Sequence, residues 1–574
     1  MVRKQQEQMN YRTHKTHGFF LVLLTILMPT GILIGQEDNS HNEQVTIIGS
    51  IDPSINEAYK INQQPKAGQL SLQHPEFEFN YLDKQTATKI TLEPITPAKI
   101  NVDKRKKTYK NLLVAGIGSL FSPYVNFLHS AGRRNSYRFT TQIYHLSAFR
   151  NIPEYTNPYT NTSALLNYEK FSGNHIINTG FQYKLNTNRF YGFVESEYQG
   201  IDPDDSNLKQ MFNLMQANVG IRSNYKNNKK LFHSISLSGY YYFDRYKTSE
   251  ANAVLPFDFY KSFDVTKALN YQYLGLKGKI TYFRNSDTLI TSSDLFVNLT
   301  PYFKARYGIV NFRLGLSFSY LNTTEGSLHF YPELDATVEL IPDRLTIYAG
   351  IDGGLEKNSF YLLADENPYV SSTIDTRWKN NKFSGYAGIR GNIGQKIGFN
   401  IEGGWTKFDN EYFFVNTYFN AEVAPNGPLN KFDVVYDAGS VWHIGGEVNH
   451  TYDTKFKTWL RVRYNSYTLD SLSQPCHKPI TEIKLGASYL IKKVNIWTEL
   501  YYSGKRYAFD PRWSLPSEIT LDPFVDINLG VDYQLKDNFT VFLKLTNLLN
   551  HNYEIYYNYP SQGINVMAGI KFKF

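Results

Sequence analysis

Cysteine is nearly absent from this chain of 574 residues, which contains only Cys476. One cysteine excludes an internal disulfide, and Cys476 with the adjacent His477 supplies too few ligands for a metal site. Long apolar runs are scarce as well. Outside residues 19–34, no stretch approaches the ~20 continuous apolar residues that a membrane-spanning helix requires. The sequence therefore excludes a disulfide-stapled domain and a bundle of membrane helices.

Catalytic motifs are missing too. The sequence has no Gly-x-Ser-x-Gly elbow, no His-Glu-x-x-His zinc helix and no phosphate-binding Gly-rich loop with a lysine. A hydrolase whose Ser, His and acid come from separate strands would leave no such motif and stays open. The formal net charge of +8 is too small, over so long a chain, for a nucleic-acid-binding surface. We expect no enzyme, no catalytic residue, no metal, no cofactor and no nucleic-acid partner.

Aromatic residues, in contrast, are abundant. They make up 16% of the chain, with 45 Tyr and 39 Phe, although the mean hydropathy is on the hydrophilic side. This pairing is unusual in a soluble protein. It is typical of a transmembrane β-barrel, in which only alternate residues face lipid and aromatic girdles lie at both membrane interfaces.

The end of the chain, residues 563–574, alternates between apolar and mostly polar positions. The apolar positions are Ile564, Val566, Ala568, Ile570, Phe572 and Phe574. This period of two predicts a β-strand long enough to cross a bilayer, although an edge strand of a soluble sheet would share it. The period recurs in residues 312–320, 525–533 and 539–545. The predicted fold is therefore all-β: a transmembrane antiparallel β-barrel with an even number of strands near 20, within about 16 to 22.

Connections between the strand candidates come in two sizes. A tight turn is predicted at residues 186–188. Long polar connections are predicted at residues 151–173, 247–267 and 358–382. Short periplasmic turns and long outer loops are typical of such barrels. Residues 112–128 and 190–198 are each predicted as one strand. Between residues 246 and 340 the alternation of inner and outer turns is wrong by one, which indicates a strand missed or counted twice.

The chain divides into three parts. Residues 1–35 have a basic start and an apolar core that ends at Gly35, and they are predicted to be a cleaved secretory signal. Residues 36–108 are polar and proline-punctuated, which predicts a short irregular periplasmic extension. Residues 109–574 are the predicted barrel. This order predicts export to the outer membrane of a Gram-negative cell.

Short motifs are spread along the mature chain: V-T-I-I at residues 45–48, N-P-Y at 367–369 and N-L-L-N-H-N-Y-E at 547–554. Together with the closing strand, they resemble the barrel of TonB-dependent receptors, in a short form common among Bacteroidetes that lacks a full plug domain. The 36–108 segment is too short for the plug that such receptors carry. The resemblance implies contact with outer-membrane lipid. It also implies insertion by the barrel assembly machinery, with Phe572 and Phe574 as the C-terminal assembly signal.

One motif concerns a periplasmic partner. Val45, Thr46, Ile47 and Ile48 are similar to the short segment that pairs with TonB as an added strand. A generic extended segment would have the same residues, so coupling to TonB stays open, as does another periplasmic or outer-membrane protein as the partner.

Charged residues occupy the positions opposite the apolar ones and are expected to line the lumen, because charges are costly at the lipid face. The predicted lining residues are Arg313, Arg390, Glu447, Arg461, Arg463, Glu499, Asp526, Asp532 and Lys544. They are either a wet wall with cross-strand charge pairs or a selective lining for a charged solute. Aromatic loops at residues 413–418 and 553–559 either grip a ligand or pack among themselves.

Two functions remain. The first is a receptor-like barrel that takes part in uptake or passage of a solute across the outer membrane. The second is a barrel subunit of an envelope or secretion complex without a transport role. A barrel this wide and without a full plug would leak, so we expect loops, the 36–108 segment or a partner chain to occupy the lumen.

Overall fold

The computed structural model describes residues 108–131, 136–149, 157–192, 208–225, 229–323, 326–417, 431–453, 455–510 and 517–574. The first strands are β1 (Asn111–Gly118), β2 (Ser122–Ser130), β3 (Tyr137–Ala148), β4 (Tyr159–Ser172), β5 (His175–Arg189), β6 (Lys209–Ser223), β7 (Phe232–Asp244), β8 (Ser249–Ser262) and β9 (Asn270–Ser286). They are followed by β10 (Thr291–Tyr307), β11 (Val310–Asn322), β12 (Ser327–Ile341), β13 (Leu345–Lys357), the helix α2 (Phe360–Glu366), β14 (Trp378–Ile393), β15 (Ile397–Asn416), β16 (Phe432–Tyr452) and β17 (Phe456–Leu469). The last are β18 (Thr481–Ile491), β19 (Val494–Ser503), β20 (Arg506–Asp510), β21 (Ser517–Leu521), β22 (Phe524–Lys536), β23 (Phe539–Thr546), β24 (Glu554–Tyr556), β25 (Tyr559–Pro560) and β26 (Asn565–Lys573).

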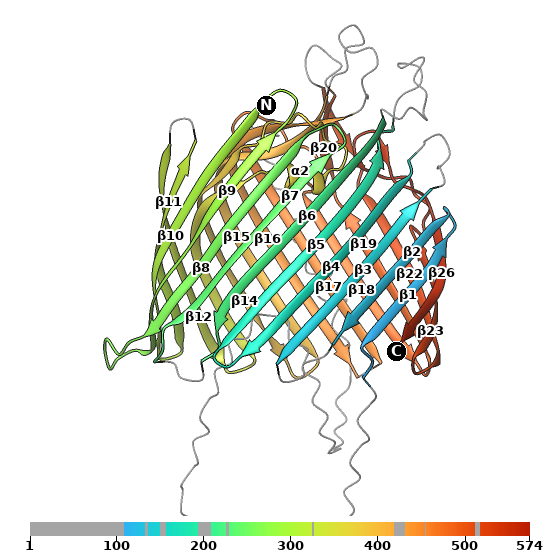
Figure 1. Ribbon diagram of the computed structural model, residues 1–574. Coiled ribbons are helices and arrows are strands. Elements are labelled where there is room, and N and C mark those ends of the chain that lie inside the picture. The colour runs from blue at the N-terminus through green and yellow to red at the C-terminus, as the bar shows by residue number, and fades with distance from the viewer. Residues whose placement is uncertain are drawn as a thin grey trace, which may run out of the picture. The chain divides into compact units, whose positions relative to one another are not determined.

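Most of these strands form one closed antiparallel sheet of 22 strands (Figure 1). Each strand pairs with its neighbour in the chain, and the sheet closes because β1 pairs with both β2 and β26. The pairs β20–β21 and β24–β25 are separate hairpins between barrel strands. Closure removes every sheet edge, so that all strand backbone groups are paired inside the membrane. The predicted all-β barrel is confirmed, and its 22 strands lie within the expected range.

The strand prediction was wrong in several places. Residues 112–128 are two strands, β1 and β2, joined by a turn in which Phe121 has a positive φ of 48°. The predicted loops 151–173 and 247–267 contain β4 and β8. Residues 190–192 of the candidate 190–198 lie outside any strand, and the rest of that candidate lies outside the described residues.

The missed strand β8 explains the error in turn alternation, because it lies between residues 246 and 340. The tight turn predicted at residues 186–188 was also wrong, since these residues continue β5. β4 and β8 escaped because apolar residues at inward positions interrupt the alternation. Inward Leu165 lies beside outward Leu166 in β4, and inward Val254 lies beside outward Leu255 in β8.

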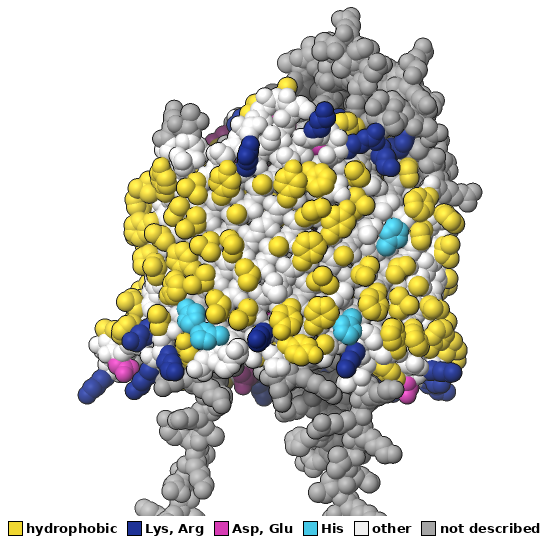
Figure 2. All heavy atoms as spheres, viewed as in Figure 1, with side chains coloured by type: hydrophobic (Ala, Val, Ile, Leu, Met, Phe, Trp, Pro, Cys, Tyr) yellow, Lys and Arg dark blue, Asp and Glu magenta, His cyan; other side chains and the backbone are white. Residues whose placement is uncertain are grey.

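The two faces of the sheet differ sharply where the sequence predicted it. In β11, Leu314 is 48% exposed and Leu316 43% exposed, whereas Ser317 and Ser319 on the opposite face are buried. Figure 2 shows the resulting band of hydrophobic side chains on one side of the barrel's outer surface. So large an exposed apolar surface is stable only against lipid. In the described part of the chain, no helix has the length and apolar character needed to span a membrane.

Several strands are longer than a bilayer requires. β15 has 20 residues and β16 has 21, whereas about 9–11 suffice for a tilted crossing. The surplus lies at the end that carries the long connections, which we call the outer end. The predicted signal 1–35, most of the extension 36–108 and residues 45–48 lie outside the described residues, and these assignments stay predictions.

Candidate functional site

The connection between β13 and β14, residues 358–377, contains the helix α2. Ser359 caps the helix, since its Oγ accepts a hydrogen bond from the Leu362 N–H at 3.2 Å. One face of the helix is fully enclosed: Leu363 is 0% exposed. The prediction of residues 358–382 as a polar loop was wrong here, although a serine followed by an apolar run is a sequence signal for a helix.

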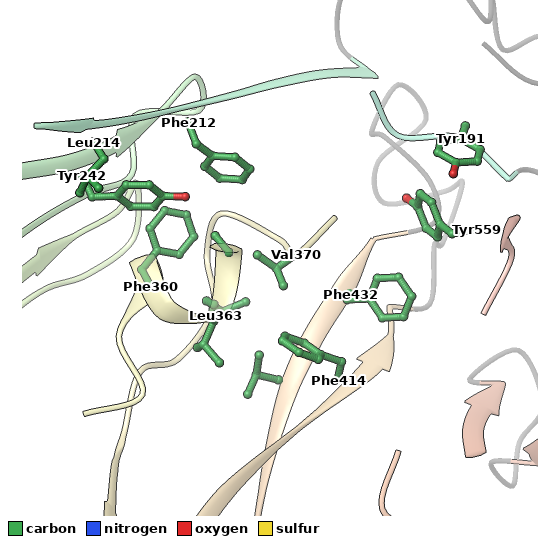
Figure 3. Packing of buried hydrophobic residues seen from close by; sticks show 13 residues of the cluster. Tyr191, Phe212, Leu214, Tyr242, Phe360, Leu363, Val370, Phe414, Phe432 and Tyr559 are labelled. Carbon is green, nitrogen blue, oxygen red and sulfur yellow. The ribbon is translucent and has the colours of Figure 1, made fainter. Parts of the chain in front are cut away.

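The helix joins a cluster of buried side chains, here called the outer core (Figure 3). The outer core consists of Tyr191, Phe212, Leu214, Tyr242, Phe360, Leu363, Ala364, Val370, Ile374, Phe414, Phe432, Val434 and Tyr559. The Phe360 ring lies 6.2 Å from Phe212 on β6 and 5.6 Å from Tyr242 on β7, between ring centroids. A loop that begins at β13 therefore crosses the barrel interior to reach the inward face of β6 and β7, and it fills the outer end.

Polar contacts fix the loop to distant parts of the wall. Lys184 Nζ on β5 lies 2.5 Å from Asp365 Oδ1 on α2. The Asn188 side-chain amide, also on β5, donates to the Pro368 carbonyl at 2.9 Å. These polar contacts add to the apolar packing and set the position of the helix across the lumen.

Two buried carboxylates complete the attachment. Glu250 on β8 accepts hydrogen bonds from the Phe360 N–H at 2.7 Å, the Tyr361 N–H at 3.5 Å and the Tyr240 hydroxyl at 2.6 Å. Asp244 at the end of β7 accepts from the Gln210 amide at 3.0 Å and from the Ser372 hydroxyl.

The burial of Glu250 and Asp244 makes opening of the loop costly. Buried charge is costly unless it is hydrogen-bonded. Both groups depend on the loop for part of their partners, so opening the loop would expose unsatisfied charge unless water enters with it.

The other outer connections are fixed to each other through His477 and Arg506. The His477 Nδ1–H donates to the Phe414 carbonyl at 2.9 Å, and its Nε2 accepts from the Tyr557 N–H at 3.3 Å, which is the pattern of a neutral ring. Burial, aided by nearby Arg506, lowers the pKa of His477 to about 4. Burial also raises the pKa of the neighbouring Cys476 thiol to about 12, so it is protonated and inert at neutral pH.

A cavity of about 500 Å³ lies among inward side chains of β9 and β12 to β17. It is lined by Lys277, Glu333, Asp352, Gly353, Gly354, Glu356, Lys379, Asn381, Ser384, Thr406, Glu411, Val441, His443, Arg463, Asn465 and Tyr467. Glu411 pairs with Lys379 at 2.5 Å and with Lys478 at 2.8 Å. Arg463 forms no ion pair with any described residue. Glu411 precedes Tyr412, which packs against the outer core, so the cavity adjoins that core.

The nine predicted lining residues all lie on the strand face opposite the hydrophobic band, but the structure does not bring them together. Arg463 alone lines the cavity. Arg313 pairs with Asp335 at 2.6 Å and Glu333 at 3.1 Å, and Glu447 pairs with Arg461 at 2.9 Å.

The remaining members are spread around the wall. Their partners are Tyr348 for Arg390, Tyr553 for Asp526, Lys571 for Asp532 and Trp497 for Lys544, while Glu499 is exposed. Most of these groups are thus cross-strand partners within the wall.

The aromatic loops pack among themselves in the parts that the structure describes. Phe413 and Phe414 are buried, and Tyr559 stacks on Tyr369 with 3.8 Å between ring centroids. Glu250, Asp244 and Lys184 were not predicted as anchors, because their partners lie far away along the chain and no local pattern marks them.

A closed barrel with a hydrophobic outer band, a charged interior and a loop-filled outer end defines an outer-membrane β-barrel. No protein-family model and no curated protein matches the sequence. Solved structures do match in fold. The pyoverdine outer membrane receptor FpvA of Pseudomonas aeruginosa, bound to pyoverdine, shares 13% identity at a TM-score of 0.59, over 82% of this chain and 79% of the receptor.

Two further solved structures also match this chain in fold. The FrpB iron transporter from Neisseria meningitidis shares 12% identity at a TM-score of 0.58, with 82% of each chain covered. The siderophore receptor PirA from Acinetobacter baumannii shares 10% identity at a TM-score of 0.59, over 81% of this chain and 80% of PirA. The expected likeness to the barrel of TonB-dependent receptors is confirmed at the level of the fold.

Proposed function

We propose that this protein takes part in the uptake or passage of a solute across the outer membrane through the interior of its barrel. The observation that carries this proposal is the cavity of about 500 Å³, which lies inside the barrel beside the outer core and is lined by charges of both signs. Rings of charged side chains select the solutes that pass through a pore. The fold shared with siderophore and iron receptors supports the same function.

The nine predicted lining residues would then act as part of a selective wall, with Arg463 nearest to the solute. Arg463 is the group we assign to contact an anionic part of the solute, because its guanidinium can bind carboxylate or phosphate through two parallel hydrogen bonds. We propose no enzymatic role.

The finer family assignment is also a proposal. The sequence motifs support a short receptor of the Bacteroidetes type without a full plug, in which Val45, Thr46, Ile47 and Ile48 pair with TonB or another periplasmic protein. The closing strand supports insertion by the barrel assembly machinery. Phe572 and Phe574, which stack with 5.3 Å between ring centroids, would form its recognition signal.

The filled outer end also favours a second function, in which the barrel transports no solute. A barrel closed in this way also suits a non-transport subunit of an envelope or secretion complex. Co-purification with another envelope protein at fixed stoichiometry would favour this function over uptake.

The test is planar-bilayer conductance of the mature protein beside a variant lacking residues 36–108. We expect the mature protein to stay closed. We expect the variant to conduct in brief openings, when the outer core that fills the outer end loosens, because residues 36–108 then no longer seal the periplasmic side. If both proteins stay closed, the barrel does not conduct solutes and the subunit function is favoured. If both conduct, a partner chain must seal the barrel in the cell, and the proposed role of residues 36–108 is wrong.

A further inference from the structure

Four basic side chains gather at the outer end of neighbouring strands. Lys209 begins β6, Arg245 and Lys247 lie in the turn between β7 and β8, and Arg284 lies near the end of β9. All four are exposed. We call them the basic cluster. None of the four forms an ion pair with a described residue.

The alternation along β6, β7 and β9 places the side chains of Lys209, Arg245 and Arg284 on the outward face and not in the lumen. Arg284 shares its face of β9 with Tyr282, which is 43% exposed, and Lys209 shares its face of β6 with Met215, which is 45% exposed. Arg245 continues the face of Tyr241 on β7. The basic cluster therefore continues the lipid-facing surface beyond the hydrophobic band.

The cluster is also compact. Phe212 on β6 pairs with Asp244 on β7. Lys209 lies three positions before Phe212 on β6. The Asp244 N–H donates to the Thr248 carbonyl at 2.9 Å, so residues 245–247 form a tight turn just past the end of β7, beside the first residues of β6. Neighbouring strands are about 4.8 Å apart, so Arg245 and the two lysines are close enough to contact one phosphate-bearing headgroup together.

Below the cluster lies the hydrophobic band. Figure 2 shows Lys and Arg side chains along the upper edge of that band, on the face formed by these strands. A lipid of the outer leaflet has its acyl chains at the level of the band and its headgroup phosphates just above it. Arginine and lysine are the side chains that recognise phosphate, and clusters of them beside a membrane bind anionic headgroups.

We propose that the basic cluster binds the phosphate groups of the anionic glycolipid of the outer leaflet, lipopolysaccharide, while the acyl chains lie on the hydrophobic band below. The cluster holds this lipid on the β6 to β9 side of the barrel. The proposal rests on the outer-membrane location of the barrel and does not depend on solute uptake, so either can fail without the other.

The test uses the full-length protein in detergent and bisphosphorylated lipid A as the probe, with binding measured by native mass spectrometry. The test variant carries Lys209→Gln, Arg245→Gln and Lys247→Gln. We expect the wild type to bind bisphosphorylated lipid A at least about tenfold more tightly than dephosphorylated lipid A, and the variant to lose that preference.

The matched control removes two lysines and one arginine at the opposite end of the barrel, through Lys267→Gln, Arg344→Gln and Lys493→Gln. These residues are equally exposed. The control is expected to keep the preference of the wild type. The proposal would be overturned if the control lost the preference as much as the test variant, or if the test variant kept the preference of the wild type. Binding of phosphatidylglycerol as tight as that of bisphosphorylated lipid A would overturn it too.

Folding is checked by heat-dependent migration on electrophoresis. If the triple variant does not fold, Arg245→Gln alone takes its place. A loss of about threefold is then expected, since one of three charged contacts is removed. An unchanged affinity of this single variant would overturn the proposal in the same way.

Discussion

At the scale of the residue, His477 shows how buried polar groups fix the outer connections. Its ring is only 8% exposed and both nitrogens have backbone partners, Phe414 and Tyr557. A neutral ring satisfies both partners at once. A protonated ring would present an N–H to another N–H, so the arrangement favours the neutral form and depends on pH.

We predict that the outer connections around His477 loosen as the pH falls. In the opened state the imidazole protonates near its ordinary pKa of ~6.5, whereas in the closed state its pKa is about 4. The opened state therefore takes up the proton first. The contribution of His477 to stability is fully present above pH ~6.5 and is lost as the pH falls toward ~4.

Between about pH 7.5 and pH 5 the expected loss is ~2 kcal/mol. Hydrogen exchange of the amides near Tyr557 measures it as a lower free energy of local opening. His477→Gln removes the titrating group and should show little change across this range. The same pH dependence in that variant would assign the effect to other groups.

At the scale of the element, α2 is held by groups from the opposite wall. Its first N–H groups bind Glu250 of β8, and Asp365 binds Lys184 of β5. A helix this short has little stability of its own in water. Its position is therefore set by the outer core and by these anchors.

We predict that Glu250→Ala loosens α2 and opens the outer end of the barrel. Losing hydrogen bonds to a charged acceptor should lower the free energy of local opening by about 2 kcal/mol. Faster exchange of the Phe360 and Tyr361 amides measures this. The effect on the pore is measured in the variant lacking residues 36–108, where Glu250→Ala should give a larger conductance in planar bilayers. Glu499→Ala is the matched control, because Glu499 is an exposed glutamate on the inward face. Equal exchange in the two variants would show that Glu250 does not anchor the helix.

At the scale of the whole molecule, closure of the barrel depends on a tight seam between β1 and β26. Gly116 and Gly569 are partners across this seam. A Cβ at Gly569 would lie 2.2 Å from the Ala115 carbonyl oxygen and 2.6 Å from the Phe542 ring. Backbone of the first strand blocks any larger side chain there.

We predict that Gly569→Ala weakens closure, because the seam must move apart to accept a methyl group. The expected cost is about 1–3 kcal/mol, measured by urea unfolding of the protein inserted in lipid vesicles. Gly354→Ala is the control, since a Cβ there meets nothing within 4 Å. A stable Gly569→Ala barrel beside an equally stable control would show that the seam tolerates displacement.

The sequence predicted the barrel where lipid imposes a simple rule. In residues 312–320 every second side chain is apolar because it faces acyl chains, and the structure keeps that face exposed. The prediction failed at β4 and β8, where apolar residues also occupy inward positions, such as Leu165 in β4 and Val254 in β8. Apolar and polar residues therefore do not alternate cleanly along these two strands.

The sequence by itself determined the fold class, the closing strand and the inward placement of charges, because alternation against lipid is a local property of each strand. Only the tertiary structure decided what fills the outer end and which charges meet. Glu250 and Phe360 are 110 positions apart in the chain. Their contact exists because closure of the 22-strand sheet brings opposite walls around the same lumen, and no local pattern in the sequence encodes that distance.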